Sequence, residues 1–202
     1  MTINPDDLIN SILNSISRID YIRQDSLPDI DLYMDQVTTF MDSHMASTRR
    51  RPEDKILTKT MINNYAKNNL LPPPVKKKYS KEHMLILIFI YYFKNILSIT
   101  DIQSLLNPIT EKYFKGNPDF SIEQLYNEVF GMENAQVDSL KKDILEKYTV
   151  SSGTFQDAPK EDQEFLQHFA FICMLSFDVY MKKQLIEKLI DTLPEFSPGK
   201  KK

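Results

Sequence analysis

The sequence contains few of the residues on which enzyme sites and disulfide frameworks are built. Its 202 residues include one cysteine, three histidines and four glycines. A single cysteine, Cys173, excludes an intramolecular disulfide. There is no glycine-rich phosphate loop, and His44, His83 and His168 do not have the spacing of metal ligands. We therefore expect no enzymatic activity, no bound metal and no cofactor.

A hydrophobic run long enough to cross a membrane is also missing. The most apolar run, MLILIFIYYF at 84–93, has ten residues, whereas a spanning helix needs about 20. A longer apolar stretch at 165–181 is interrupted by polar side chains such as Asp178. The first residues lack the basic segment that begins a signal peptide. These features predict a soluble, cytoplasmic protein without a membrane partner.

Charge is unevenly distributed along a chain whose formal net charge is only −3. Residues 1–45 carry two basic and eight acidic side chains, and residues 83–202 carry 13 basic and 17 acidic ones. Residues 46–82 instead carry ten basic and three acidic side chains, a net charge of +7. Such a concentration of positive charge indicates a contact surface for a polyanion. A solvated loop that gathered lysines by chance is the alternative.

Apolar residues recur at helical spacing almost throughout, whereas alternating strand-like patterns are nearly absent. The sequence therefore predicts a mainly all-α fold, with the run at 84–93 as the core helix of the first domain. Asn107-Pro108 is expected to end that domain. The expected helices cover about 8–19, 31–45, 59–68, 80–93, 98–106, 121–130, 137–148 and 159–193. In the second of these helices, Asp29 or Asp31 is the expected cap, and the side chains expected to face inward are Tyr33, Val37, Phe40 and Met41.

The segment TKTMINNYAKNNLLPPPVKKKYS at 58–80 combines an amide-rich helix, a stiff turn and a cationic tip. Thr58 is expected to cap a helix over 59–68. Its apolar face holds Ile62, Tyr65 and Ala66. Its polar face holds Thr60, Asn63, Asn64 and Lys67, at helical spacing. Asn69 is expected to end the helix in the left-handed conformation. The prolines at 72–74 then force an excursion that carries outward the three lysines Lys76, Lys77 and Lys78.

The asparagines of this helix need an explanation, because Asn is a poor helix former. The major groove of DNA offers one. Asparagine can bond adenine at N6 and N7, and Thr or Lys can reach bases or phosphates. A general excess of Asn and Lys in a protein from an AT-rich genome is the alternative.

The same residues resemble the winged helix-turn-helix domain of MerR-type transcription regulators. The shared pattern begins with a capping residue, Thr58, and a helix ending Tyr65-Ala-Lys-Asn-Asn69-Leu70-Leu71. A proline, a basic wing at 76–78, Tyr79-Ser80 and an apolar helix follow. The pattern closes with Leu97-Ser98-Ile99-Thr100-Asp101-Ile102. The stretch from about Leu27 to Leu106 is also similar to a bacterial family known as domain of unknown function 1836 (DUF1836), which is regarded as MerR-like.

This resemblance implies an organisation and a function. The implied domains are an N-terminal arm at 1–27, a MerR-like winged helix-turn-helix domain at 28–108, and a C-terminal helical module at 119–195 for dimerisation or effector binding. The implied function is sequence-specific binding of double-stranded DNA by a homodimeric regulator, associated with the bacterial nucleoid when bound. The contacts expected with DNA involve Thr58, Thr60, Asn63, Asn64, Tyr65, Lys67, Arg49, Arg50, Arg51, Lys76, Lys77, Lys78 and Tyr79.

Two other functions stay open at this point. A protein-interaction module could have kept a helix-turn-helix scaffold, and a small enzyme could have its site in the C-terminal half. The apolar stretch FLQHFAFICMLSFDVYMKKQLIEKLI, which begins at Phe165, is the core helix of a small bundle, a dimer interface or a pocket for an apolar effector. The sequence does not identify such an effector.

Overall fold

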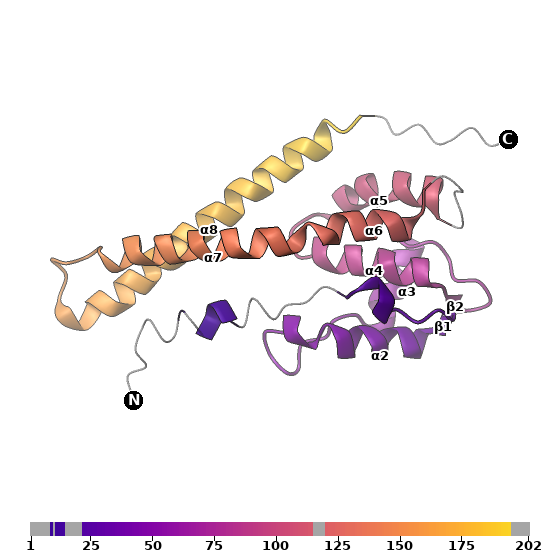
Figure 1. Ribbon diagram of the computed structural model, residues 1–202, viewed down its shortest axis with the longest axis horizontal. Coiled ribbons are helices and arrows are strands. Elements are labelled where there is room, and N and C mark those ends of the chain that lie inside the picture. Colours follow the sequence, from indigo (N-terminus) through magenta and orange to yellow (C-terminus); the bar gives the residue numbers. More distant parts are fainter. Residues whose placement is uncertain (1–8, 10, 15–21, 115–119, 195–202) are drawn as a thin grey trace. The chain divides into compact units, whose positions relative to one another are not determined.

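The computed structural model describes residues 9, 11–14, 22–114 and 120–194 (Figure 1). The chain forms two compact units, Met1–Gly131 together with Leu193–Lys202, and Met132–Thr192. Both units are helical, which confirms the mainly all-α prediction, and the sheet found among the described residues has only two strands. The predicted helix at 8–19 is helical at residues 9 and 11–14, and its other positions lie outside the described residues.

The first unit carries the elements on which the sequence analysis concentrated. Its elements are η1 (Gln24–Ser26), β1 (Leu32–Tyr33), α2 (Met34–His44), η2 (Ala46–Thr48), α3 (Lys59–Lys67), β2 (Lys78–Tyr79), α4 (Lys81–Phe93), α5 (Ile99–Tyr113) and α6 (Ile122–Gly131). The second unit consists of α7 (Glu133–Ser152) and α8 (Lys160–Asp191).

Helix α4 is the centre of the first unit and confirms the predicted core helix. Every residue from His83 to Tyr91 is buried, so the helix is covered on all sides. Its cover includes β2, α5 and α6, which contact it directly. At its start, the Ser80 amide donates to Nδ1 of His83 at 2.9 Å, which caps the helix without exposing a polar group.

Helix α2 is shorter than predicted, and one of its expected core residues faces out. Val37 and Met41 are fully buried, but Tyr33 is 54% exposed. Leu32 pairs with Tyr79 in the antiparallel ladder, and successive side chains of a strand point to opposite faces, so burial of Leu32 turns Tyr33 outward. The helix starts with the Tyr33 amide donating to Oε1 of Gln36 at 2.8 Å, which replaces the expected aspartate cap.

The expected end of the first domain at Asn107-Pro108 is wrong, because α5 continues to Tyr113 with Pro108 inside it. Ser98 caps this helix by accepting a hydrogen bond from the Asp101 amide at 3.1 Å. The additional turn brings Phe114 edge-on to the buried His83 ring, at 4.7 Å between centroids. Aromatic packing of this kind offsets the backbone hydrogen bond that a proline removes.

Helix α6 belongs with the first unit. Ser121 and Gln124 form the predicted capping box, with amide-to-side-chain bonds of 2.9 and 3.1 Å. Tyr126 is buried, donates its hydroxyl to the Ile22 carbonyl at 2.5 Å and meets the Phe89 ring edge-on. The compact units therefore divide after Gly131, whereas the sequence analysis placed a boundary between 108 and 119.

The second unit is a hairpin of two helices. Tyr148 of α7 packs edge-on against Phe171 of α8 at 5.5 Å. Lys147 of α7 bonds the Asp143 carboxylate on its own helix and the Asp178 carboxylate on α8, the latter at 2.8 Å. These hydrogen bonds raise the pKa of Lys147, so the ammonium stays charged at neutral pH. The predicted long helix at 159–193 corresponds to α8.

The Tyr126 hydroxyl gives a test of the packing of α6. We expect Tyr126→Phe to lower the free energy of unfolding by about 1–3 kcal/mol, because it leaves the Ile22 carbonyl buried without a donor. Tyr33→Phe, at an exposed position of β1, should change it by less than about 0.5 kcal/mol. Urea denaturation of both variants measures the difference, and equal effects would contradict the assigned role of the hydroxyl.

Candidate nucleic-acid interface

Buried apolar residues in helix α3 and directly after it determine which face of the helix points to solvent. Ile62 is fully buried, and Leu70 and Leu71 are 1% exposed. As predicted, Thr58 caps the helix, with Oγ1 accepting from the Met61 amide at 3.2 Å. Asn69 takes the predicted left-handed conformation, with φ of 54°, which directs the two leucines back into the core.

The opposite face of α3 is exposed and carries hydrogen-bonding groups. Thr60, Asn63, Asn64 and Lys67 all lie on the surface. Within residues 22–114 and 120–194, the structure gives these four side chains no hydrogen-bond or ion-pair partner. The face is therefore free to bond a ligand, as the sequence analysis required.

The lysine segment forms a tight two-residue turn. The Val75 amide donates to the Lys78 carbonyl at 3.0 Å, and the Lys78 amide donates to the Val75 carbonyl at 2.9 Å. Between them, Lys76 and Lys77 both have positive φ, 49° and 65°, as the type I′ turn requires. This geometry normally selects Asn and Gly, because a side chain in the left-handed region costs about 1–2 kcal/mol. The two lysines are exposed at the tip despite that strain.

Tyr33 is a candidate contact residue that the sequence analysis placed in the core. It pairs with Lys78 in the β1–β2 register, and the Lys78 ammonium lies 5.2 Å from the centre of the Tyr33 ring. An exposed aromatic ring thus lies beside the cationic turn, where it can stack on a sugar or base. A strand of two residues leaves no alternating pattern, so no local signal in the sequence could have found it.

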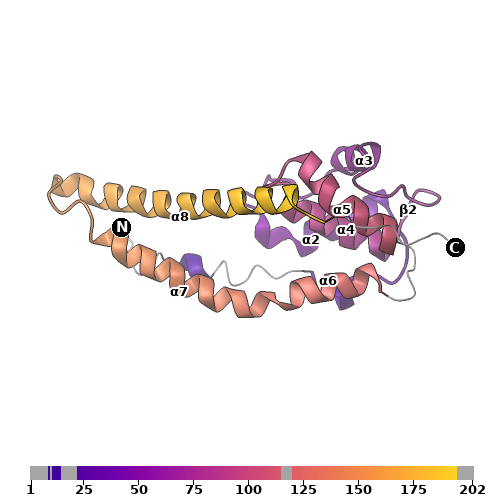
Figure 2. The same cartoon turned by 90° about the horizontal axis from the view of Figure 1, so that it is seen from above.

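Helix α2 connects α3 to the lysine turn. It contacts both α3 and β2, and its Asp35 forms an ion pair with Lys59, the first residue of α3. On the other side of the turn, Nε2 of His83 lies 3.4 Å from the Pro73 carbonyl, which ties the proline segment to α4. Figures 1 and 2 show the loop that leads into β2 extending beyond the ends of the neighbouring helices. The polar face and the turn are thus parts of one packed unit.

Two of the predicted contact tyrosines are less accessible than expected. Tyr79 is only 3% exposed, and its ring packs edge-on to His83 at 5.5 Å between centroids. This corrects its assignment as a DNA contact, since Tyr79 anchors β2 in the core instead. Tyr65 is half-buried. Burial raises the pKa of both phenols, so they stay neutral at physiological pH.

The three arginines at 49–51 do not form one cationic cluster. The Arg49 guanidinium forms an ion pair with the Asp42 carboxylate at 2.9 Å, so its charge is already paired. Arg50 and Arg51 are exposed. The Arg51 amide bonds the Asp54 carboxylate at 2.9 Å, within a turn that also contains Glu53. Acidic neighbours therefore reduce the positive potential here relative to the lysine turn.

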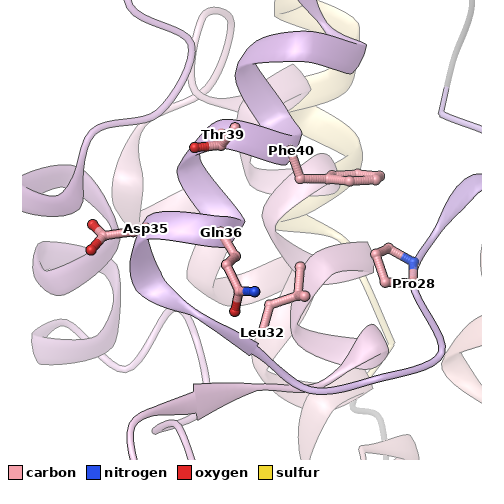
Figure 3. Close-up of a pocket in the computed structure, with 6 residues that line it drawn as sticks. All are labelled: Pro28, Leu32, Asp35, Gln36, Thr39 and Phe40. Carbon is pink, nitrogen blue, oxygen red and sulfur yellow. The ribbon is translucent and has the colours of Figure 1, made fainter.

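A shallow hollow of about 370 Å³ lies beside β1 and α2. Its lining residues are Pro28, Leu32, Asp35, Gln36, Thr39 and Phe40 (Figure 3). Figure 3 shows the Asp35 carboxylate pointing away from the Phe40 and Pro28 rings. Asp35 is the one charged member of this set, and it pairs with Lys59, so the hollow presents apolar surface rather than a set of reactive groups.

The described part of the chain contains neither a metal-binding cluster nor a helix that could span a membrane. No group of three or more His, Cys, Asp or Glu side chains there is arranged to hold a metal ion. None of the helices in that part combines the length and the apolar character that crossing a bilayer needs.

Comparison with known proteins identifies a family. Residues 22–129 match the family described as domain of unknown function (DUF1836). The match confirms the resemblance to DUF1836 noted for 27–106 and extends it through most of α6, in agreement with the packing of that helix. No curated protein and no solved structure matches the chain.

Replacing the lysine turn by the residues that its geometry favours should stabilise the protein. We expect the double variant Lys76→Asn, Lys77→Gly to raise the free energy of unfolding by about 1–2 kcal/mol, because both new residues tolerate positive φ. The control Lys76→Ala, Lys77→Ala removes the same charges without relieving the strain. Urea denaturation compares them. Equal stabilisation by both variants would show charge repulsion, and not backbone strain, to be the cause.

Proposed function

The chain belongs to the DUF1836 family, and we propose that it is a sequence-specific DNA-binding transcriptional regulator. The observation that carries this proposal is the exposed hydrogen-bonding face of α3, where Thr60, Asn63 and Asn64 are uncharged, held in the same packed unit as the turn at 75–78. A helix face that contacts only water usually carries charged side chains and not asparagine, which is a poor helix former. A surface that reads base edges needs both donors and acceptors, which asparagine supplies.

In this proposal α3 enters the major groove. Asn63 and Asn64 bond base edges, adenine by preference, because the asparagine amide matches the N6 donor and N7 acceptor. Thr60 contacts a base or the adjacent phosphate. The side chains of all three residues are exposed and have no partner among the described residues, so little internal bonding has to be broken on binding.

Lysines supply the contacts with the phosphate backbone. Lys67 follows the polar face of α3, and Lys76, Lys77 and Lys78 form the turn that acts as the wing. Thr58 and Tyr65 belong to the cap and the body of α3, and the exposed Arg50 and Arg51, in the connection that precedes it, are further candidates for phosphate contacts. Lys67, Lys76 and Lys77 have no carboxylate partner among the described residues. Three phosphate contacts per copy correspond to a slope of log affinity against log salt of about −3.

The order of elements supports a winged helix-turn-helix arrangement. Helix α2 is the first helix, α3 the recognition helix, and the β1–β2 ladder with its turn the wing. The long connection between α2 and α3 is anchored in the core by Ile56 and Leu57. Regulators with this arrangement bind as homodimers on two half-sites. A regulator of this kind would act in the bacterial cytoplasm, on the nucleoid when bound.

Two classes of substitution separate base reading from backbone binding. We expect Asn63→Ala or Asn64→Ala to reduce the difference in binding free energy between specific and random DNA by about 1–3 kcal/mol. The variant Lys76→Ala, Lys77→Ala should weaken both DNAs alike and make the salt slope shallower by about 2 units. Fragments selected from the source genome provide the specific DNA, and fluorescence anisotropy at several salt concentrations gives the affinities.

A matched control removes two lysines from the second unit, as Lys141→Gln, Lys142→Gln, and should leave DNA affinity unchanged. Folded protein that fails to bind any DNA even at low salt would overturn the proposal. It would favour instead a protein-interaction module on the same scaffold. If the asparagine and lysine variants have identical effects, the protein binds DNA but Asn63 and Asn64 do not read the bases.

A further inference from the structure

The α7–α8 hairpin leaves most of its apolar surface uncovered. Among its described side chains, the apolar ones that are buried are Ile144 and Phe171. Large apolar side chains of α8 are instead exposed by half or more of their area; they include Phe165, Phe169, Ile172, Phe177 and Tyr180. A pair of helices has only one mutual contact face, so this surface requires a further layer.

One exposed stripe of α8 has a symmetric spacing. It consists of Phe165, Phe169, Ile172, Cys173, Ser176 and Tyr180. The intervals are four, three, one, three and four residues, so the stripe reads the same from both ends about the midpoint between Ile172 and Cys173. These intervals keep all six side chains on one side of the helix. A stripe of this form can pack against its own copy in the antiparallel direction.

No charge interrupts this stripe. Between Glu164 and Lys182 the one charged residue is Asp178. Its carboxylate bonds Lys147 of α7 at 2.8 Å, so Asp178 lies on the side of α8 that faces α7. Phe171, which packs on Tyr148, lies on that same side. The outward stripe is thus uncharged along its length, as the core of an obligate interface is.

The ends of α8 carry opposite charge. Three carboxylates lie near its start, at Glu161, Asp162 and Glu164, accompanied by Lys160. Three lysines lie toward its end, at Lys182, Lys183 and Lys188, accompanied by Glu187 and Asp191. Asp162 and Lys183 are equally distant from the midpoint between Ile172 and Cys173. Antiparallel pairing of two copies places opposite charges together, whereas parallel pairing places like charges together.

We propose that the stripe is covered by a second copy of this chain, with the two α8 helices antiparallel about a twofold axis between Ile172 and Cys173. Two hairpins then form a four-helix assembly. At roughly 100–150 Å² each, the four large exposed side chains of the stripe supply on the order of 500 Å² per copy. A stable interface buries about 800 Å² per partner, so α7 and the charged ends need to add only the remainder.

This self-association deepens the proposed function, because it supplies the dimer that two half-sites require, but it does not rest on DNA binding. Its test uses the full chain without DNA. We expect a dimer by sedimentation equilibrium. Phe169→Glu should raise the dissociation constant by a factor of about ten or more, because it buries an unpaired charge in the interface. Met181→Glu, at an equally exposed position of α8 outside the stripe, is the matched control and should have no such effect.

The register has its own test, with Cys173 as a reporter. In the antiparallel arrangement the two Cys173 residues lie beside the axis, so mild oxidation should give a disulfide-linked dimer. The double variant Cys173→Ser, Phe165→Cys places its cysteines about 22 Å apart along the axis, at 1.5 Å per residue, and should not crosslink. Crosslinking of both proteins would indicate a parallel arrangement and overturn the register.

Charge reversal tests the same register independently. Asp162→Lys and Lys183→Glu should each weaken the dimer, and the two combined in one chain should restore it, because the pairs across the axis are re-formed. A chain that is monomeric in solution would overturn the proposal and leave the stripe to another partner, a membrane surface or the chain's own first unit. A chain that dimerises but does not bind DNA would support the proposed dimer and contradict the proposed function as a DNA-binding regulator.

Discussion

The first unit is organised by the burial of α4 on every side. A helix that is apolar around its whole circumference cannot lie at the surface, so other elements have to enclose it. Each of these elements has one apolar face, and burial of that face decides which side chains point outward. In α3, the burial of Ile62, Leu70 and Leu71 decides which side of the helix faces solvent. The exposure of its amides is therefore a consequence of core packing and needs no interaction of its own.

The same packing explains how a strained turn persists. Lys76 and Lys77 adopt a backbone conformation that few side chains tolerate. The segments on both sides of the turn are fixed, since Tyr79 is buried in the β1–β2 ladder and the Pro73 carbonyl lies against His83. Because both flanking segments are held in place, Lys76 and Lys77 cannot relax to a backbone conformation of lower energy. Strain held in this way is common where a side chain must be presented in a fixed direction.

The sequence predicted correctly those features for which the local residue pattern and the packing of the core favour the same conformation. The cap at Thr58, the left-handed Asn69 and the apolar run of α4 each have one physical solution. It failed where tertiary contacts decided. Pro108 is tolerated inside α5 because the helix gains aromatic packing beyond it. The exposure of Tyr33 and the burial of Tyr79 follow from a two-residue ladder, too short to leave a period in the sequence.

The two units solve the problem of a small core in different ways. The first encloses one helix completely, whereas the hairpin has too few facing positions to bury its own aromatic residues. A second copy would complete that core and at the same time double the proposed DNA-binding surface. In the proposed complex, a single α3 would present only Thr60, Asn63 and Asn64 to base edges, and each good pair discriminates by about 1–3 kcal/mol. Two linked copies make the second contact intramolecular, so that modest individual contacts suffice for a specific site. In this view the exposed apolar surface of the hairpin and the small number of base contacts from α3 are related. Association of two hairpins would bring two α3 helices to one DNA site and so compensate for the few contacts that each helix makes.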